Sequence, residues 1–334
     1  MKKLLILALV LMLAFSFTAC DNKDDDDSAR GDTPKDNSSN IGSTGSNDGS
    51  NDSENSNQSG NNNTNIVAQP SEGLKFALNS DGLSYAVSGI GACTDKDIVI
   101  PATHNNLPVT SIGSEAFEDC TSITSITITD SVTSIGARAF YRCSSLKDIT
   151  IPDSVTSIQG YTFHECNSLT SVTIPNGVNA IENRTFAYCE NLKSVTLGNN
   201  IAYIGEEAFY FCESLTNITI PNKVTSIPRS AFSFCTSLTS VELGNSVTSI
   251  AYYAFRNCTS LTSITIPNSV TAIDNYAFSD CSKLISVTFE NPEGWWYASI
   301  ASAKSGTSIS WLSDTSTAAA YLSDTYCGKY WKRS

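Results

Sequence analysis

A phenylalanine–cysteine spacing that repeats eight times constrains this chain more than any other feature. The phenylalanines lie 23 residues apart, and each is followed three residues later by a cysteine. The series runs from Phe117 and Cys120 to Phe278 and Cys281. A unit of this size cannot bury an apolar face alone, so successive units must stack and supply the missing wall for one another. The spacing therefore predicts a solenoid.

The apolar positions within each unit predict how the chain runs around one coil. In the third unit these positions are Val155, Ile158, Phe163, Cys166, Leu169, Val172 and Ile174. Apolar and polar residues alternate at Val172, Thr173 and Ile174, which predicts a short strand near 169–174. We expect a turn at 175–177, where Asn176-Gly177 tolerates positive φ, and a second short extended run at 178–181. The residues around Phe186 leave room for one helical or irregular turn.

The repeated unit resembles the BspA-like subgroup of leucine-rich repeats, whose unit reads Val-Thr-Ser-Ile-Gly-x-x-Ala-Phe-x-x-Cys-x-x-Leu-x-x-Ile-x-Ile-Pro. Residues 132–152 match this pattern closely, and the match continues over about 107–290. The resemblance implies a repeat solenoid of the leucine-rich type. Each 23-residue coil would hold short β-strands and one turn of helix or irregular structure, with caps at both ends.

Changes of composition along the chain predict five segments. They are a lipoprotein signal peptide at 1–19, acylated Cys20 with an acidic and Ser/Asn/Gly/Asp-rich disordered linker at 20–72, an N-terminal cap at 73–108, the leucine-rich-repeat solenoid of eight Phe-x-x-Cys coils at 109–290, and an aromatic C-terminal cap at 291–334. The linker has almost nothing apolar to bury, so it cannot offset the entropy of ordering. The first and last coils of a solenoid expose apolar faces that must be covered, so the segments at 73–108 and 291–334 are interpreted as caps.

The aromatic residues of the C-terminal segment allow two interpretations. All four tryptophans lie beyond Phe289, at Trp295, Trp296, Trp311 and Trp331. Bulky rings would cover the last apolar layer of the solenoid well. They could also form a platform for carbohydrate or peptide, because such rings stack on apolar faces.

The N-terminus predicts secretion and attachment to a membrane. Two lysines precede an apolar run that is too short for a comfortable transmembrane helix. The sequence around Phe17–Cys20 resembles a bacterial lipobox, which implies acylation of Cys20 and an outer-membrane location; a plain secretory cleavage site is the alternative. The acidic run at 21–27 resembles an export tag for the cell surface, or is simply a solvated charge run. Arg30-Gly31-Asp32 matches an integrin ligand, as short sequences often do by chance.

Little in the sequence indicates catalysis. The chain has two histidines, His104 and His164, and neither is expected to meet a specific carboxylate. No phosphate loop or zinc spacing is visible, and evenly spaced single cysteines do not supply the close pairs of a metal site. We therefore expect no enzyme, no cofactor and no metal, and buried free thiols rather than disulfides. A net charge of −13 disfavours nucleic acid as a partner.

Positions that the repeat leaves free to vary hold the candidate binding residues. The candidates are Tyr203, Tyr210, Phe211, Phe234, Tyr252, Tyr253, Arg229 and Arg256, and Tyr141, Tyr161, Tyr188 and Tyr276 occupy similar places. Exposed aromatic residues beside arginine have the composition of an interface; stacking of the rings between turns is the alternative. A row of strand threonines, from Thr127 to Thr288 and interrupted by Glu242, is a second candidate surface. Its alternative explanation is β-propensity alone.

These features predict a cell-surface binding protein. The family resemblance implies an adhesin-like role, in which the rod recognises host matrix proteins or other cells. Its partners would be proteins or glycans of the host or of neighbouring cells, with membrane contact through the lipid anchor only. A non-binding surface scaffold or spacer and a carbohydrate-binding accessory lipoprotein are the alternatives.

Overall fold

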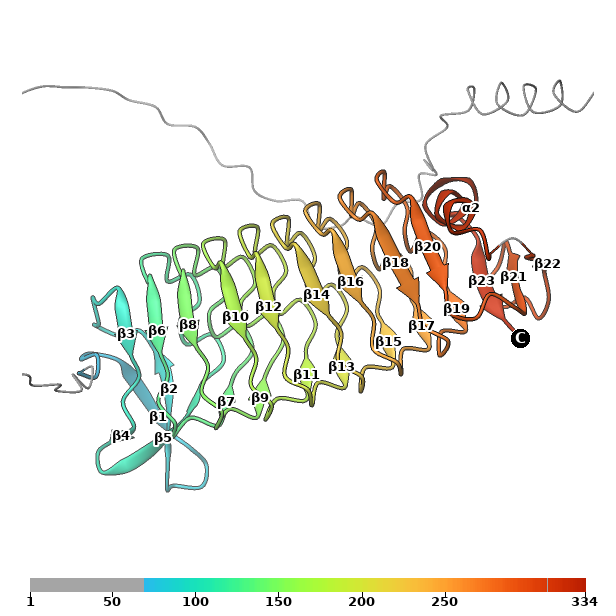
Figure 1. The fold of residues 1–334 in the computed structure, drawn as a ribbon. Coiled ribbons are helices and arrows are strands. Elements are labelled where there is room, and N and C mark those ends of the chain that lie inside the picture. The colour runs from blue at the N-terminus through green and yellow to red at the C-terminus, as the bar shows by residue number, and fades with distance from the viewer. Residues whose placement is uncertain (1–68, 311) are drawn as a thin grey trace, which may run out of the picture. The chain divides into compact units, whose positions relative to one another are not determined.

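The computed structural model describes residues 69–310 and 312–334, and these residues form a β-solenoid (Figure 1). The coils follow one another along the rod with the 23-residue period of the sequence. The predicted repeat solenoid is therefore confirmed, whereas the two caps remain predictions. The predicted signal peptide, Cys20, the predicted linker as far as residue 68, Arg30-Gly31-Asp32 and Trp311 lie outside the described residues.

One row of short parallel strands forms where the sequence alternates with a period of two. The strands are β3 (Asp97–Val99), β6 (Ser125–Thr127), β8 (Asp148–Thr150), β10 (Ser171–Thr173), β12 (Ser194–Thr196), β14 (Asn217–Thr219), β16 (Ser240–Glu242), β18 (Ser263–Ile266) and β20 (Ser286–Phe289). Identical repeat positions pair directly, as Val172 does with Val195. The inward Val or Ile side chains therefore line up along the core, and the Ser and Thr side chains line up on the surface.

A second row of parallel strands forms from the run that follows each turn. It contains β5 (Leu107–Ile112), β7 (Ser134–Ile135), β9 (Ser157–Ile158), β11 (Ala180–Ile181), β13 (Tyr203–Ile204), β15 (Ser226–Ile227), β17 (Ser249–Ile250) and β19 (Ala272–Ile273). The predicted turn at 175–177 precedes β11, but Gly177 does not adopt positive φ there. A Cβ atom on Gly177 would lie 2.7 Å from the carbonyl oxygen of Val155, so close approach of the previous coil explains this glycine.

The third side of each coil is an irregular turn rather than a helix, and it forms a third hydrogen-bonded ladder. The residue two before and the residue two after each repeat phenylalanine adopt positive φ, from Glu115 and Asp119 in the first coil to Tyr276 and Asp280 in the last. In the first coil the N–H groups of Glu115, Phe117 and Asp119 all donate to carbonyl oxygens of the next coil, at 2.8–2.9 Å. The same pattern recurs along the rod, so these peptide groups align in one direction.

The left-handed turn residues give a direct stability prediction. Asp119→Pro should lower the free energy of unfolding by about 3 kcal/mol or more, because proline cannot adopt φ near 57° and lacks the N–H that bonds to Tyr141. Asp119→Gly should stay within about 1 kcal/mol of the parent, since relief of left-handed strain and extra chain entropy oppose each other. Urea denaturation compares the two variants, and equal losses would contradict the role given to the turn.

Phenylalanine rings form a continuous stack inside the rod. Neighbouring repeat rings from Phe117 to Phe278 are 5.2–5.6 Å apart between centroids and 5–16° from parallel. All of these phenylalanines are fully buried. We call this row of rings the inner stack.

The repeat cysteines lie beside the inner stack as free thiols. The nine cysteines from Cys93 to Cys281 are free. From Cys143 onward each thiol donates to the carbonyl oxygen of the phenylalanine 26 residues earlier, for example Cys189 to Phe163 at 3.0 Å. Burial raises the pKa of the Cys189 thiol to about 12, so this cysteine is protonated and unreactive near neutral pH.

Two hairpins lie at the N-terminal end of the rod. Strands β1 (Lys75–Leu78) and β2 (Tyr85–Gly89) pair antiparallel, and β2 continues the second row by pairing with β5. Strand β4 (Thr103–His104) folds back on β5 through Asn105 and Asn106, which both adopt positive φ as a two-residue hairpin turn requires.

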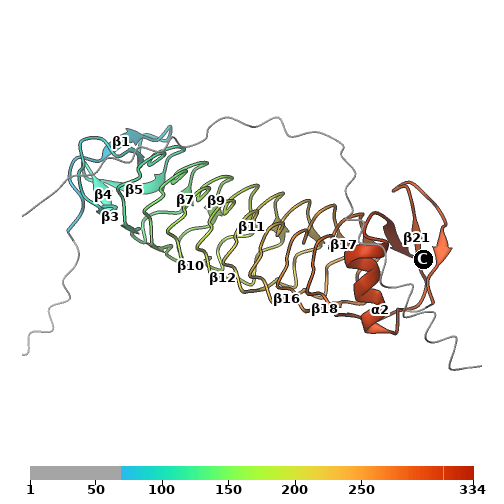
Figure 2. The same cartoon turned by 90° about the horizontal axis from the view of Figure 1, so that it is seen from above.

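The C-terminal segment contacts all three sides of the last coil. Its elements are β21 (Trp295–Ala298), β22 (Thr307–Ser308), α2 (Thr315–Ala320), the π-helix η1 (Tyr321–Thr325) and β23 (Tyr330–Arg333). Strand β23 pairs antiparallel with β19, α2 lies against β20 (Figure 1), and the carbonyl oxygen of Cys327 accepts the N–H of Tyr276. Figure 2 shows α2 from above, beside the end of the rod. Trp295 and Trp331 are buried in this region. These contacts suit a cap, which remains a prediction.

Candidate interaction surface

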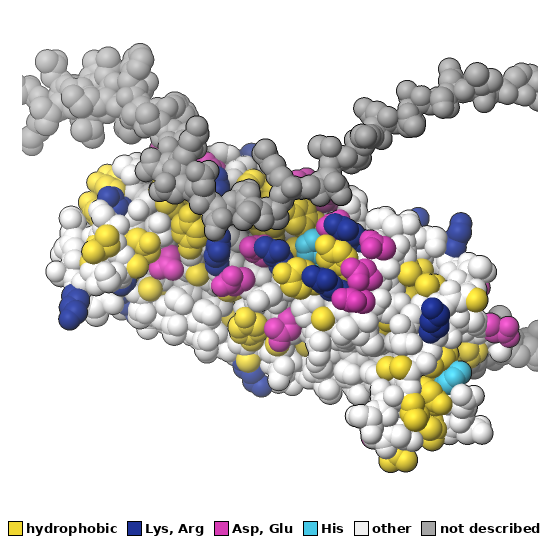
Figure 3. All heavy atoms as spheres, turned by 180° about the vertical axis from the view of Figure 1, so that it is seen from behind, with side chains coloured by type: hydrophobic (Ala, Val, Ile, Leu, Met, Phe, Trp, Pro, Cys, Tyr) yellow, Lys and Arg dark blue, Asp and Glu magenta, His cyan; other side chains and the backbone are white. Residues whose placement is uncertain are grey.

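The outward-facing residues of the irregular turns form one surface, which we call the turn face. Its residues occupy positions −3, −2, +1 and +2 relative to each repeat phenylalanine. Large side chains gather at these positions, namely Tyr141, Tyr161, His164, Tyr188, Tyr210, Phe211, Phe234, Tyr252, Tyr253 and Tyr276. Figure 3 shows this side of the rod, with apolar groups and charges of both signs near its middle.

The turn face contains a second stack, which runs beside the inner stack and which we call the outer stack. Its members in order are Arg142, Tyr141, His164, Tyr188, Phe211, Phe234, Arg256, Tyr253 and Tyr276, with 4.3–5.9 Å between ring centroids or between a guanidinium carbon and a ring. Phe211 and Phe234 are the closest pair, at 4.3 Å and 12° from parallel. Because neighbours lie against the ring faces, the rings are half-buried, apart from His164, which is buried.

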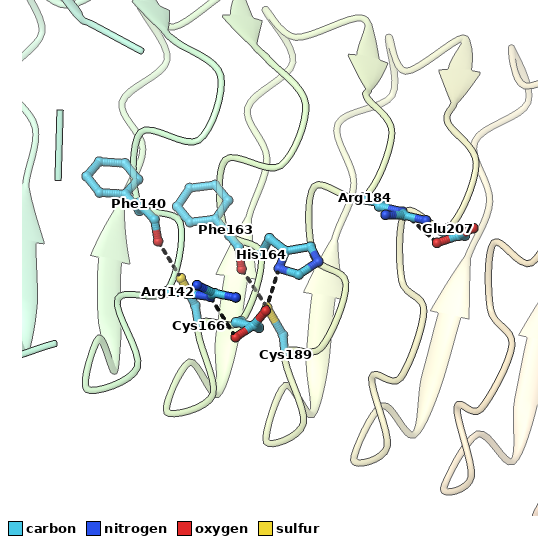
Figure 4. Close-up of polar contacts among 9 residues, drawn as sticks. Phe140, Arg142, Phe163, His164, Cys166, Arg184, Cys189 and Glu207 are labelled. Carbon is cyan, nitrogen blue, oxygen red and sulfur yellow. Dashed lines mark hydrogen bonds and ion pairs between the residues drawn. The ribbon is translucent and has the colours of Figure 1, made fainter. Parts of the chain in front are cut away.

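Ion pairs between consecutive coils accompany the outer stack. They join Arg138 to Glu115 at 3.8 Å, Arg142 to Glu165 at 3.1 Å, Arg184 to Glu207 at 2.6 Å and Arg256 to Asp280 at 3.6 Å. Figure 4 shows the pairs of Arg142 and Arg184. These side chains are partly exposed, so each pair contributes at most about 1 kcal/mol to stability.

His164 is the most deeply buried polar ring of the turn face. It is 6% exposed, and its ring lies among those of Tyr141, Tyr161 and Tyr188. Its Nδ1 approaches Glu165 Oε1 at 3.3 Å (Figure 4), so the prediction that no histidine meets a carboxylate is wrong for His164. The buried Nδ1 nevertheless has no hydrogen-bond partner in the described part of the chain, so the approach is not a hydrogen bond.

The environment of His164 keeps its ring neutral at pH 7. Burial is the main cause, and the guanidinium groups of Arg184, Arg142 and Arg138 add repulsion; together they lower the pKa of His164 to about 4. The ring therefore packs as an aromatic group. It does not act as a cation in the outer stack.

Most of the candidate residues predicted from sequence come together on the turn face. The ring of Tyr210 contacts those of Phe211 and Phe234, and the ring centroids of Tyr252 and Tyr253 are 3.7 Å apart. Arg229 lies over Tyr252 at 6.0 Å, and Arg256 lies over Phe234 and Tyr253.

Tyr203 is the exception among these candidates. It lies on β13 and is 47% exposed, and its hydroxyl is 3.5 Å from Asn183 Oδ1. No ring contact joins Tyr203 to the outer stack within the described residues.

Sequence reasoning missed His164 and the arginines Arg138, Arg142 and Arg184 as parts of this surface. A signal for them existed, because residues 23 apart occupy the same place in successive coils. His164 follows Tyr141 by 23 residues, and Glu165 follows Arg142 by 23. Counting in this register would have placed them together.

The threonine row forms a separate, exposed surface on the first row of strands. Thr173, Thr196 and Thr219 are exposed there. On the flanking row, Thr239 Oγ1 donates to the carbonyl oxygen of Thr216 at 2.9 Å, so part of the hydroxyl row already bonds to its own backbone. Nothing in this arrangement indicates a particular ligand.

Two further properties of residues 69–310 and 312–334 concern metal ions and membranes. No group of three or more His, Cys, Asp or Glu side chains in this range could hold a metal ion. Nor does any helix in this range have the length and apolar character needed to cross a membrane.

Comparison with known proteins identifies the repeat. A family model described as "BspA type Leucine rich repeat region" matches in six copies, over residues 93–216 and 202–298. Among solved structures, a leucine-rich repeat protein of T. pallidum is 27% identical with a TM-score of 0.53, over 65% of this chain and 90% of that one. A leucine-rich cell surface protein of Faecalibacterium prausnitzii is 23% identical with a TM-score of 0.34, over 68% of this chain and 96% of that one. No curated protein matches the chain.

Proposed function

We propose that this chain, which belongs to the BspA-type leucine-rich repeat family, is an adhesin-like protein of the bacterial cell surface. It binds proteins of a host or of neighbouring cells through its turn face. Leucine-rich repeats of this kind are typically scaffolds for protein interaction rather than catalysts, and members of the family are bacterial cell-surface proteins. The family and the fold support the general role in protein interaction. The turn face is the basis for the proposed place of binding.

The outer stack is the observation that supports the turn face best. Tyrosine and arginine are enriched at protein interfaces and at the residues that dominate their binding energy. In the outer stack these side chains are already held in place by rings or guanidinium groups of adjacent coils. A partner would therefore bind ordered side chains, and little conformational entropy would be lost on association.

Attachment to the membrane is the part of the proposal that rests on sequence alone. We propose that Cys20 is acylated and that the protein is anchored in the outer membrane with its rod on the cell surface. Protease treatment of intact cells tests this placement, because it should remove the rod from cells without lysis. Survival of the rod on intact cells, with digestion only after lysis, would contradict surface exposure.

The geometry favours protein over carbohydrate as the partner of the turn face. Sugar rings bind aromatic side chains by stacking on a free ring face. In the outer stack those faces are occupied, since Phe211 has Tyr188 on one side and Phe234 on the other. A partner meets ring edges, hydroxyl groups and guanidinium groups instead. Such a mixed surface suits the side chains of another protein.

Binding of the full-length protein to immobilised extracellular-matrix proteins and to a glycan array tests the proposal. Replacing Tyr210, Tyr252 and Tyr253 together with alanine should weaken binding to the protein ligand by about tenfold or more, as loss of interface anchors does. Thr173→Ala/Thr196→Ala on the strand surface is the matched control and should bind like the parent.

The outcomes separate the three candidate functions. Binding to a matrix protein that depends on the tyrosines supports the proposal. Binding to glycans alone would favour a carbohydrate-binding protein. An intact protein that binds neither class would favour a spacer and would contradict the proposal.

A further inference from the structure

Arg229 differs from every other arginine of the turn face. Each of the others has a carboxylate of an adjacent coil within 4 Å. No ion pair joins Arg229 to a carboxylate within residues 69–310 and 312–334, and its side chain is exposed. Its positive charge is therefore uncompensated at the protein surface.

Arg256, one coil further along, is compensated only in part. Its Nε is 3.6 Å from Asp280 Oδ2, yet this buried Nε has no hydrogen-bond partner in the described chain. The contact is thus weaker than the pair of Arg184 with Glu207, which is 2.6 Å long. About a third of the Arg256 side chain remains open to solvent, at 35%.

A pair of tyrosines connects these two arginines. The guanidinium of Arg229 lies 6.0 Å from the ring centroid of Tyr252, and that of Arg256 lies 4.6 Å from the ring centroid of Tyr253. The two tyrosine rings are 3.7 Å apart. Contact with an aromatic face attracts a guanidinium and limits its orientations. We call these four residues the arginine–tyrosine cluster.

We propose that the arginine–tyrosine cluster anchors an acidic segment of the partner protein, through Asp or Glu carboxylates that bind Arg229 and Arg256. This proposal rests on the proposed function and specifies the chemistry of its partner. A guanidinium presents paired N–H donors that match the two oxygens of a carboxylate. The tyrosines beside it offer apolar contact and hydroxyl groups to the rest of the segment.

The overall charge of the chain determines how this anchor would work. With a net charge of −13 the protein repels acidic partners at long range. The cluster therefore attracts a carboxylate only at short range, when that carboxylate lies close to the guanidinium group of Arg229 or Arg256. It should also weaken as salt screens the exposed charges.

Poly-L-glutamate serves as the probe for this chemistry, because it presents carboxylates on a peptide backbone. The full-length protein should bind immobilised poly-L-glutamate at about 50 mM NaCl and bind it more weakly at about 300 mM. Arg229→Glu/Arg256→Glu should reduce binding at least about tenfold, as loss of charged hydrogen bonds does. Asp280→Asn should strengthen binding, because it releases Arg256.

Lys147→Glu/Lys193→Glu is the matched control. Both lysines are exposed and directly precede strands β8 and β12, away from the turn face, and their substitution changes the net charge by as much as Arg229→Glu/Arg256→Glu. This variant should keep its affinity for poly-L-glutamate within about twofold. Arg229→Lys/Arg256→Lys adds a milder variant, which keeps both charges but loses the paired donors and should bind with intermediate affinity.

The results can overturn this inference without affecting the proposed function. No binding of poly-L-glutamate, or equal binding by the parent and Arg229→Glu/Arg256→Glu, would contradict the anchor. Binding of dextran sulfate but not of poly-L-glutamate would contradict it in favour of sulfated glycans. If a matrix protein still binds and still depends on Tyr210, Tyr252 and Tyr253, only the acidic nature of the partner is wrong.

Discussion

Replacing Phe186 with alanine is expected to lower the free energy of unfolding by about 3–5 kcal/mol. Phe186 is fully buried in the inner stack, with ring centroids of Phe163 and Phe209 at 5.3 and 5.5 Å. Alanine would remove the ring from both contacts and leave a cavity that the two neighbouring coils cannot close, because their backbones are fixed by three ladders of hydrogen bonds. Urea denaturation followed by circular dichroism measures the loss.

In a solenoid, this substitution should also change the shape of the denaturation curve. Each coil contacts only its neighbours, so a weakened coil in the middle can uncouple the two halves of the rod. We expect Phe186→Ala to lower the slope of the denaturation curve or to introduce a second transition, as happens when unfolding ceases to be two-state.

Two variants outside the inner stack serve as controls for Phe186→Ala. Phe211→Ala, in the half-buried outer stack, should cost less, and Tyr203→Ala should stay within about 0.5 kcal/mol of the parent. If Phe186→Ala costs no more than Tyr203→Ala, the inner stack does not hold the coils together.

The sequence predicts the core of this fold well, because the same apolar positions recur in every unit. Phe163, Cys166 and Leu169 are all fully buried, as the repeat indicates. A side chain that recurs at one place in every coil must meet its own copy in the next coil. Periodicity alone therefore identifies the inward-facing residues.

The geometry of the turn could not be predicted from the sequence. Positive φ is expected at glycine or asparagine, yet the turn adopts it at residues such as Tyr161, Arg184 and Phe211. The penalty is offset by hydrogen bonds to the next coil, such as that from Phe211 to Ser233 at 3.0 Å. The backbone preferences of neighbouring residues cannot predict these hydrogen bonds, because the accepting carbonyl group lies more than twenty residues away in the sequence.

For the candidate surface, too, the repeat position of a residue predicts whether it lies in the core, but not which side chains of adjacent coils it contacts. Repeat position correctly indicates that Tyr210 and Tyr253 lie outside the core. Their half-buried state depends on which side chains occupy adjacent coils, and therefore on contacts such as that of Arg256 with Tyr253. Burial of His164 likewise requires three tyrosines from neighbouring positions at once.

Acidification from pH 7.5 to pH 5 is expected to destabilise the parent by about 2 kcal/mol more than the variant His164→Gln. The pKa of His164 is about 4 in the folded protein, against about 6.5 when the chain is unfolded. The unfolded state therefore takes up the proton first. Stability is highest above pH 6.5, falls as the pH drops towards 4, and loses nothing more from this group below that value.

Thermal or urea unfolding at each pH measures this difference. The range from pH 7.5 to 5 lies largely above the titration of ordinary carboxylates, so acid unfolding from other groups adds little to it. Charged groups that face His164 are Glu165, Arg138, Arg142 and Arg184. Arg142→Gln removes one of the repelling cations and should give a smaller pH dependence than the parent.

Because His164 lies within the outer stack, the same protonation should loosen the proposed binding surface. A charged imidazole beside three guanidinium groups must either leave its contacts with Tyr141 and Tyr188 or draw Glu165 away from Arg142. Binding to a protein ligand should therefore weaken between pH 7 and pH 5 in the parent and remain nearly constant in His164→Gln. Identical pH dependence of stability in the parent and in His164→Gln would show that this histidine is not the titrating group.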